Sequence, residues 1–279
     1  MRSLFNSSAC LLFMALLVVA SACAVQARQT RTLVWSDEFN GPAGSAVDGT
    51  KWVFETGNGS NGWGNHELEY YTNTTKNAAM DGAGNLVINA YRETLGNKFR
   101  CWNGVCQYTS ARLKTQGRFE QAYGRFEARM RLPYGQGIWP AFWMLGNNIQ
   151  TAGWPACGEI DIIENIGREP SIVHGTMHGP GYSGAAGIGA PYALTAGAFA
   201  DAFHVFAVEW EPNQIRWYVD GRLYQTRTPA DLPAGSAWVF DHPHFVLLNL
   251  AVGGYWPGDP DTTTVFPQKM YVDYVRVYR

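Results

Sequence analysis

The sequence predicts an all-β protein built as one sandwich of antiparallel sheets. The 279-residue chain contains 31 glycines and 14 prolines scattered without a period, which indicates many turns between short elements. Several short segments alternate polar and apolar residues, and none shows the sustained 3.6-residue periodicity of a capped amphipathic helix. About 250 residues of short strands fit one large sandwich better than two domains.

The predicted strands follow one another along the whole chain. In residues 125–132, Phe126, Ala128, Met130 and Leu132 alternate with charged residues and share one face. Asp220-Gly221 between two apolar runs predicts a hairpin turn. The other predicted strands cover residues 32–35, 86–91, 110–115, 205–210, 215–219, 245–252 and 271–278.

The composition excludes collagen-like and disordered chains, because 46% of the residues are apolar and only 16% are charged. The formal net charge is −2. We expect no nucleic-acid partner, since neutralising phosphates requires a basic surface. We also expect a monomer.

Residues 1–27 are typical of a secretory signal peptide. Met1-Arg2 gives a basic start, residues 11–20 are all apolar, and small residues follow. This apolar run is too short to cross a bilayer, which takes about 20 residues, so we expect no membrane span. The alternative for this segment is surface lipidation at Cys23. We therefore predict an exported protein in which residues 28–279 form a single domain.

Three cysteines follow this leader, and export allows them to form disulfides. Cys101 and Cys106 enclose four residues between strand-like stretches, and we predict that they close a hairpin. Cys157 is then unpaired. A buried thiol that acts as a small apolar residue is the favoured interpretation; the alternative is a thiol nucleophile, which requires a histidine base.

Three carboxylates are concentrated in residues 158–165, Gly-Glu-Ile-Asp-Ile-Ile-Glu-Asn. Acids in such an apolar run are unfavourable unless they serve a purpose. On a strand, Glu159 and Asp161 share one face, whereas Glu164 regularly points to the other. A β-bulge of one residue would return Glu164 to the shared face, and bulges are frequent beside active sites.

Two neighbouring glutamates are the machinery of a retaining glycosidase, in which carboxyl groups about 5 to 5.5 Å apart act as nucleophile and as acid and base. Repulsion between the carboxyls raises one pKa and keeps a protonated acid beside an ionised partner. The alternatives are a surface strand whose acids face water and a cation site of three carboxylates. Two flanking segments, 137–145 with Trp139 and Trp143 and 174–180 with His178, favour the glycosidase because aromatic rings stack on sugars.

These residues resemble glycoside hydrolase family 16, especially its laminarinase-like endo-β-1,3-glucanases. The E-x-D-x-x-E pattern at 159–164 and the upstream tryptophan segment carry the resemblance, which extends to residues 35–41, 62–71 and 273–278. The resemblance implies a bent, concanavalin A-like jelly roll of two antiparallel sheets with an open cleft on its concave face.

The resemblance also implies a role for individual residues. Glu159 would be the nucleophile, Glu164 the acid and base, and Asp161 the residue that tunes both. Trp139 and Trp143 would line donor-side subsites, although a tryptophan is more often a core residue.

Further contacts to sugar or to the site are implied for Asn65, Glu67 and His178. Asn65 and Glu67 are equally well explained as residues that shape a loop, and His178 as a partner of a backbone carbonyl. His66 stands where the family pattern has an asparagine.

Catalysis by this family requires no cofactor, but the resemblance implies a structural calcium ion on the convex side. Its ligands would come from Glu38, Gly82 and Asp273, with Gly84 as an equal alternative for the glycine carbonyl. The alternative for Asp273 is a place on the polar face of its strand.

The sequence therefore predicts a secreted retaining endo-glycosidase that hydrolyses β-1,3-glucan through a covalent intermediate. One alternative is a mixed-linkage β-glucanase, although the E-x-D-x-E spacing typical of licheninases is absent. Agarases and carrageenases share the motif, but the weakly acidic composition gives no support for a basic cleft. A non-catalytic β-glucan-binding lectin would have lost the two glutamates.

Overall fold

The computed structural model describes residues 31–94 and 98–279, and residues 32–279 form one compact unit. The predicted leader, residues 1–27, and the lipidation alternative at Cys23 lie outside the described residues. In the part of the chain that is described, no helix is long and apolar enough to cross a membrane.

Within residues 31–94 and 98–279, the larger sheet has ten strands. They are β1 (Leu33–Asp37), β3 (Glu69–Tyr71), β4 (Ala78–Met80), β5 (Leu86–Arg92), β8 (Tyr108–Ser110), β10 (Gly124–Arg131), β15 (His204–Glu211), β16 (Gln214–Val219), β17 (Arg222–Arg227) and β19 (Gln268–Tyr278). Their order is β17-β16-β15-β10-β19-β5-β8-β3, with β1 paired to β19 and β4 to β5.

The second sheet has seven strands in the part of the chain that the structure describes. They are β2 (Val53–Glu55), β9 (Arg112–Lys114), β11 (Ile138–Gly146), β12 (Glu159–Glu164), β13 (Ile172–His178), β14 (Ile188–Ala193) and β18 (His244–Val252). Their order is β14-β13-β12-β11-β18-β9-β2. A separate hairpin consists of β6 (Arg100–Cys101) and β7 (Gly104–Val105), and the helical pieces are α1 (Ile149–Ala152), a π-turn at Gly62–His66 and 3₁₀ turns at Gly184–Ala186 and Pro229–Asp231.

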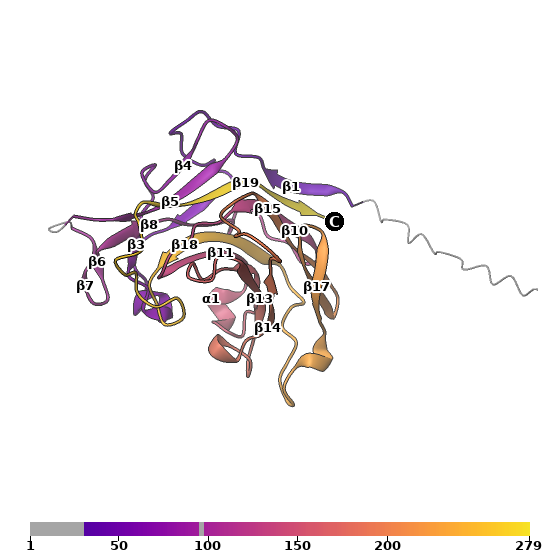
Figure 1. The fold of residues 1–279 in the computed structure, drawn as a ribbon. Helices are drawn as coiled ribbons and strands as arrows, with labels where there is room; N and C mark the ends of the chain where they lie inside the picture. Colours follow the sequence, from indigo (N-terminus) through magenta and orange to yellow (C-terminus); the bar gives the residue numbers. More distant parts are fainter. Residues whose placement is uncertain (1–30, 95–97) are drawn as a thin grey trace, which may run out of the picture. The chain divides into compact units, whose positions relative to one another are not determined.

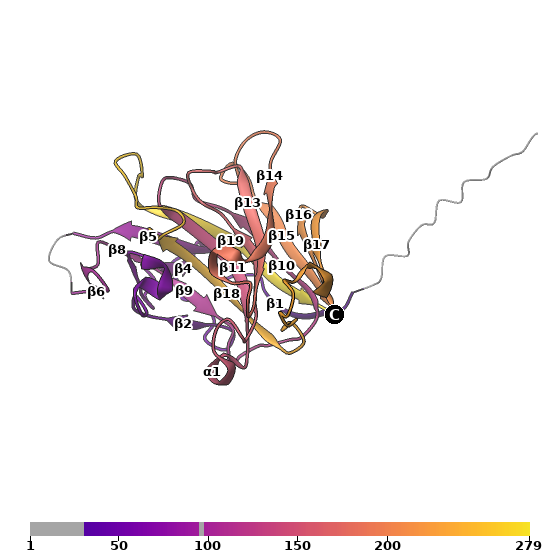
Figure 2. The same cartoon turned by 90° about the horizontal axis from the view of Figure 1, so that it is seen from below.

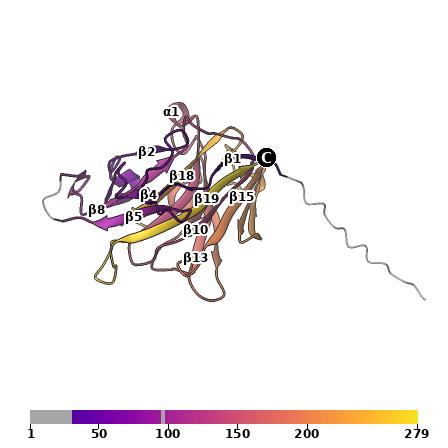
Figure 3. The same cartoon turned by 90° about the horizontal axis from the view of Figure 1, so that it is seen from above.

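The two large sheets form two layers, with β5 and β19 in one and β11 and β18 in the other (Figure 1). Figure 2 shows the seven-stranded layer from below, and Figure 3 shows β5, β19, β10 and β15 side by side from above. One continuous cluster of buried apolar side chains from both sheets fills the space between them. The predicted all-β sandwich is confirmed.

The period-two pattern predicted the buried faces correctly. Phe126, Ala128 and Met130 on β10 are fully buried in the core. Asp220 and Gly221 join β16 to β17 with φ angles of 50° and 76°, as a type I′ hairpin turn requires. Each predicted strand overlaps an observed one.

Two details differ from the prediction. The single strand expected at residues 110–115 is divided: β8 belongs to the larger sheet and β9 to the smaller, with the buried Ala111 between them. Alternation of polarity reports which face a residue takes but not which sheet it joins. The sheets are also not purely antiparallel, because β3 and β8 pair in parallel.

Candidate active site

The three acids lie on β12, which pairs with β11 on one side and β13 on the other. Trp143 pairs with Asp161 and Phe142 with Ile163, so Ile162 has no partner on β11. The register with β13 shifts in the same place. The predicted β-bulge is therefore confirmed.

The bulge turns both Ile162 and Ile163 into the core, where neither is more than 2% exposed. Regular alternation would send one of them to the opposite face. With both isoleucines in the core, Glu164 returns to the face of Glu159 and Asp161, away from the ten-stranded sheet. Asp161 is only 2% exposed and the two glutamates are half-buried, so the cluster is not a set of fully water-facing acids on a surface strand.

Each glutamate accepts a hydrogen bond from an indole. Trp154 Nε1 donates to Glu159 Oε2 at 2.7 Å, and Trp139 Nε1 donates to Glu164 Oε1 at 3.1 Å. One carboxylate oxygen of each glutamate is thus held in place by an indole.

Asp161 is the most buried of the three acids. Its Oδ2 lies 3.0 Å from Nε2 of His178, which is also 3.9 Å from Glu159 Oε1. Trp217 Nε1 donates to the Asp161 carbonyl at 2.8 Å and ties the bulged strand to the larger sheet. Ligand atoms of Glu159, Asp161 and His178 lie within 4.8 Å of one another. A cation here would compete with protons that burial keeps on the carboxyls.

Burial raises the pKa of all three acids. The pKa of Glu159 rises to about 8, because burial and then the charge of Asp161 oppose its ionisation. The pKa of Asp161 rises to about 7, again through burial. The pKa of Glu164 is raised well above its ordinary value by burial and by the charge of Asp161. The cluster therefore retains protons near neutral pH, as an acid catalyst requires.

This burial predicts a pH-dependent stability difference between the protein and its Glu159→Gln variant. The pKa of the Glu159 carboxyl is about 4.5 in the unfolded chain and about 8 in the folded protein. As the pH rises from 4.5 to 8, the unchanged protein therefore loses stability, whereas the Glu159→Gln protein does not lose this contribution. At pH 4 we expect Glu159→Gln and the unchanged protein to have equal free energies of unfolding. At pH 7 we expect the free energy of unfolding of Glu159→Gln to be higher by up to about 3 kcal/mol. Urea unfolding at both pH values measures this.

The control for that measurement is Glu169→Gln, which replaces an acid whose side chain is 41% accessible. It should show no comparable gain. A Glu159→Gln advantage that is equal at the two pH values, or larger at pH 4, would contradict the assignment of a raised pKa.

Trp139 and Trp143 lie half-buried on the face of the acids, outside the main core. The Trp139 ring meets the Trp256 ring edge-on at 5.7 Å. Trp143 Nε1 donates to Asn249 Oδ1 at 2.7 Å, and the Arg112 guanidinium lies 4.8 Å from its ring. Both indoles are thus held in place beside the acids.

Glu67 lies below the surface. It is 4% exposed and accepts hydrogen bonds from Asn65 Nδ2 at 3.1 Å and the Tyr71 hydroxyl at 3.2 Å. Glu69, which the sequence did not single out, is fully buried and accepts from the Val252 amide at 2.7 Å. Burial raises the pKa of both carboxyls, and the charge of Glu67 adds to the rise at Glu69. These contacts favour the loop-shaping interpretation of Asn65 and Glu67.

Cys101 and Cys106 are joined by a disulfide that closes the β6–β7 hairpin. Cys157 is free and fully buried. Burial, followed by the charge of Glu159, raises the pKa of its thiol to about 11. A thiol that stays protonated at neutral pH is a poor nucleophile, so the packing interpretation is favoured.

The segments predicted to bind calcium lie near one another. β1 ends just before Glu38 and pairs with β19, which contains Asp273. A Cβ on Gly82 would lie 2.9 Å from Ala43 N, and one on Gly84 would lie 3.6 Å from an oxygen of Asn40. The glycine loop therefore packs against the residues that follow Glu38.

Both predicted calcium-binding carboxylates already have cationic partners. Arg276 donates to the two oxygens of Glu38 at 2.9 and 2.7 Å, and Arg129 donates to Asp273 at 2.5 Å. These carboxylates do not fit a calcium site as they stand, because an ion bound through Asp273 would have to displace Arg129.

Sequence reasoning missed three residues outside β12 that contact the acids or the tryptophans beside them. Trp154 lies in a turn five residues before Glu159, and only the nearby acidic strand could have indicated its role. Asn249 and Trp256 act from β18 and the loop that follows it. Trp143 and Asn249 are 106 residues apart, so no local pattern predicts their contact.

Comparison with known proteins agrees with this geometry. The model of Glycosyl hydrolases family 16 matches residues 64–276. The Beta-glucanase of Rhodothermus marinus is 43% identical over 258 residues, which cover 88% of this chain and 85% of that protein. The laminarinase catalytic domain of Thermotoga maritima is 52% identical with a TM-score of 0.82 and is similar over 89% of this chain and 98% of its own. The endo-β-1,3-glucanase of Pyrococcus furiosus shows the same identity and TM-score over 89% of this chain and 94% of its own.

Proposed function

Because the chain belongs to glycoside hydrolase family 16, we propose that this glycosidase is a secreted, retaining endo-β-1,3-glucanase that acts on laminarin-like glucans. The observation that carries the proposal is the bulge of β12, which brings Glu159 and Glu164 to one face with Asp161 between them. The similarity to named laminarinases supports the β-1,3 linkage.

The first step of the reaction forms a glycosyl-enzyme intermediate. Glu159 attacks the anomeric carbon through Oε1 as the carboxylate, while Oε2 is held by the Trp154 indole. Because its pKa is raised to about 8, Glu159 must first lose its proton, and we expect the first step to speed up as the pH rises toward that value. Glu164 protonates the departing glycosidic oxygen through Oε2, because Oε1 is held by Trp139. The raised pKa of Glu164 suits it to carry this proton at neutral pH.

The second step hydrolyses the intermediate. Glu164, now ionised, takes a proton from water, and the water oxygen displaces Glu159 from the anomeric carbon. Asp161 and His178 position Glu159, since His178 Nε2 approaches both carboxyls.

Proton NMR of laminarin hydrolysis tests the proposal. We expect reducing ends to appear first as the β-anomer and the product profile to be that of internal cleavage. Immediate formation of the α-anomer would contradict retention. Release of sugar from agarose or carrageenan instead of laminarin would indicate the sulfated or galactose-based alternatives. Binding of laminarin without any release of reducing sugar would indicate the lectin.

We also propose export, on the basis of residues 1–27. A structural calcium ion is implied by the family resemblance alone, because Glu38 and Asp273 are paired with arginines and do not fit the ion as they stand. The packing of the glycine loop beside Glu38 supports a calcium site, whereas the arginine partners of Glu38 and Asp273 oppose it. If calcium binds, millimolar CaCl₂ should raise the Tm above that measured in EDTA by several degrees, with no such shift in Asp273→Asn. Equal Tm values in the two solutions would remove calcium from the assignment.

A further inference from the structure

Three aromatic rings from separate segments form a stack at the surface. His66 ends the π-turn, Trp102 lies at the tip of the β6–β7 hairpin, and Tyr255 follows β18. The His66 ring centroid is 4.1 Å from the ring of Trp102 and 4.1 Å from that of Tyr255, with interplanar angles of 28° and 32°. We call these three residues the aromatic shelf.

The aromatic shelf combines exposure with fixed geometry. Trp102 is 42% exposed and Tyr255 is 69% exposed, so both offer apolar ring surface to solvent. Exposed apolar surface of this kind marks binding sites when its residues are held in place. The disulfide closes the hairpin on either side of Trp102.

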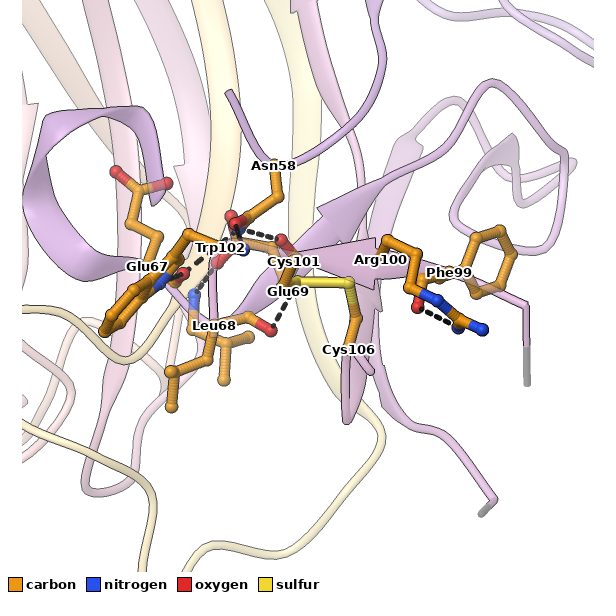
Figure 4. The surroundings of a disulfide bond; sticks show 10 residues. Asn58, Glu67, Leu68, Glu69, Phe99, Arg100, Cys101, Trp102 and Cys106 are labelled. Atoms are coloured by element: carbon orange, nitrogen blue, oxygen red, sulfur yellow. Dashed lines mark hydrogen bonds between the residues drawn. A yellow bond between two sulfur atoms is a disulfide. The ribbon is translucent and has the colours of Figure 1, made fainter. Parts of the chain in front are cut away.

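Main-chain and side-chain hydrogen bonds hold the indole of Trp102 in place. Its amide donates to Asn58 Oδ1 at 2.9 Å, and its Nε1 donates to the Glu67 carbonyl at 3.0 Å. In Figure 4 the indole lies on the Glu67 side of the hairpin, away from Phe99 and Arg100. A side chain anchored at both ends loses little conformational entropy when it binds a ligand.

Tyr255 is anchored in the same way. Its amide donates to the Asn65 carbonyl at 2.9 Å, and its hydroxyl lies 2.6 Å from His66 Nε2. The next residue, Trp256, meets the Trp139 ring, whose indole donates to Glu164. The loop that carries Tyr255 therefore also supplies a ring that contacts a tryptophan bound to Glu164.

We propose that the aromatic shelf is an outer subsite that binds a pyranose ring of a β-glucan chain beyond the rings at the glutamates. The inference rests on the proposed function. Sugar rings present apolar C–H faces, which pack against exposed aromatic rings. Such a subsite contributes binding energy only for chains long enough to reach it, so it favours polymeric glucan over short oligosaccharides.

Alanine variants of the two exposed rings test the proposal. We expect Tyr255→Ala and Trp102→Ala each to raise KM for laminarin about fivefold to tenfold. The loss of kcat/KM on laminarin should exceed the loss on laminaritetraose at least fivefold. Leu223→Ala, at a 47% exposed apolar residue on β17, is the control. It should leave KM and kcat/KM unchanged on both substrates. Equal losses of kcat/KM on the two substrates, or an unchanged KM for laminarin, would overturn the proposal that the aromatic shelf is a subsite.

Two further measurements separate this inference from folding and from the proposed function. Tyr255 is mostly exposed, so its alanine variant keeps the test valid if Trp102→Ala unfolds; thermal unfolding reports this. Calorimetry of long laminarin oligosaccharides with the Glu159→Gln protein measures binding without turnover, and adding Tyr255→Ala should weaken it about fivefold to tenfold. Laminarin cleavage without a chain-length effect refutes only the shelf, whereas no cleavage of laminarin refutes the proposed function.

Discussion

The Glu159→Gly variant is expected to hydrolyse laminarin about 10⁴-fold more slowly than the unchanged protein, because no covalent intermediate can form without the nucleophile. Azide should restore turnover of an activated aryl glycoside by entering the space of the missing carboxylate. Direct displacement by azide inverts the anomeric carbon, so the product should be the α-glycosyl azide. Product analysis by NMR measures both the rescue and its stereochemistry.

The Glu164→Ala variant gives the matched result for the other carboxyl. Here the intermediate still forms from an activated substrate, and azide attacks it in place of water, so the β-glycosyl azide is expected. Glu169→Gln, at an acid outside β12 whose side chain is 41% accessible, should retain full activity. An α-glycosyl azide from Glu164→Ala and a β-glycosyl azide from Glu159→Gly would instead identify Glu164 as the nucleophile and Glu159 as the acid and base.

Deleting one isoleucine of the pair Ile162-Ile163 is expected to lower laminarin hydrolysis about 100-fold without abolishing it. The remaining sequence, Glu-Ile-Asp-Ile-Glu, keeps all three acids on one face by regular alternation. Removing the bulge displaces Glu164 along the strand, and an error near 1 Å in a reacting group costs about 100-fold. Steady-state hydrolysis of laminarin by the folded variant measures the effect.

Folded Glu159→Ala and Glu164→Ala proteins set the baseline for the deletion. Because the deletion also removes one buried isoleucine from the core, circular dichroism and thermal unfolding must first show that the variant folds. A folded deletion variant no more active than these two proteins would contradict the geometric account of the bulge.

The fold was predictable because buried faces repeat every second residue. The bulge was predictable for a related reason: with Glu159 and Asp161 on one face, the spacing to Glu164 fits only if one extra residue is absorbed. The two isoleucines indicated where it would be absorbed. The pattern thus predicted both the strand and its irregularity.

Contacts between distant segments were not predictable in this way. Nothing near Trp143 in the sequence indicates Asn249, and nothing near Glu67 indicates that it would be buried beside Glu69. The division of residues 108–114 between two sheets has the same cause. The alternating pattern requires Leu113 to be buried, and Leu113 would be buried in the core whichever of the two sheets its strand joined. Three-dimensional proximity decides such cases.

The β6–β7 hairpin belongs to neither large sheet, whereas all three acids belong to β12. Changes in the length or sequence of this hairpin therefore leave the register of the catalytic strand intact, and peripheral loops tolerate such changes well. The contribution of Trp102 to the aromatic shelf is thus encoded apart from the strand that carries the three acids. Natural selection, or a protein engineer exchanging one hairpin for another, can vary the preferred length of the glucan while the hydrolytic chemistry is inherited unchanged.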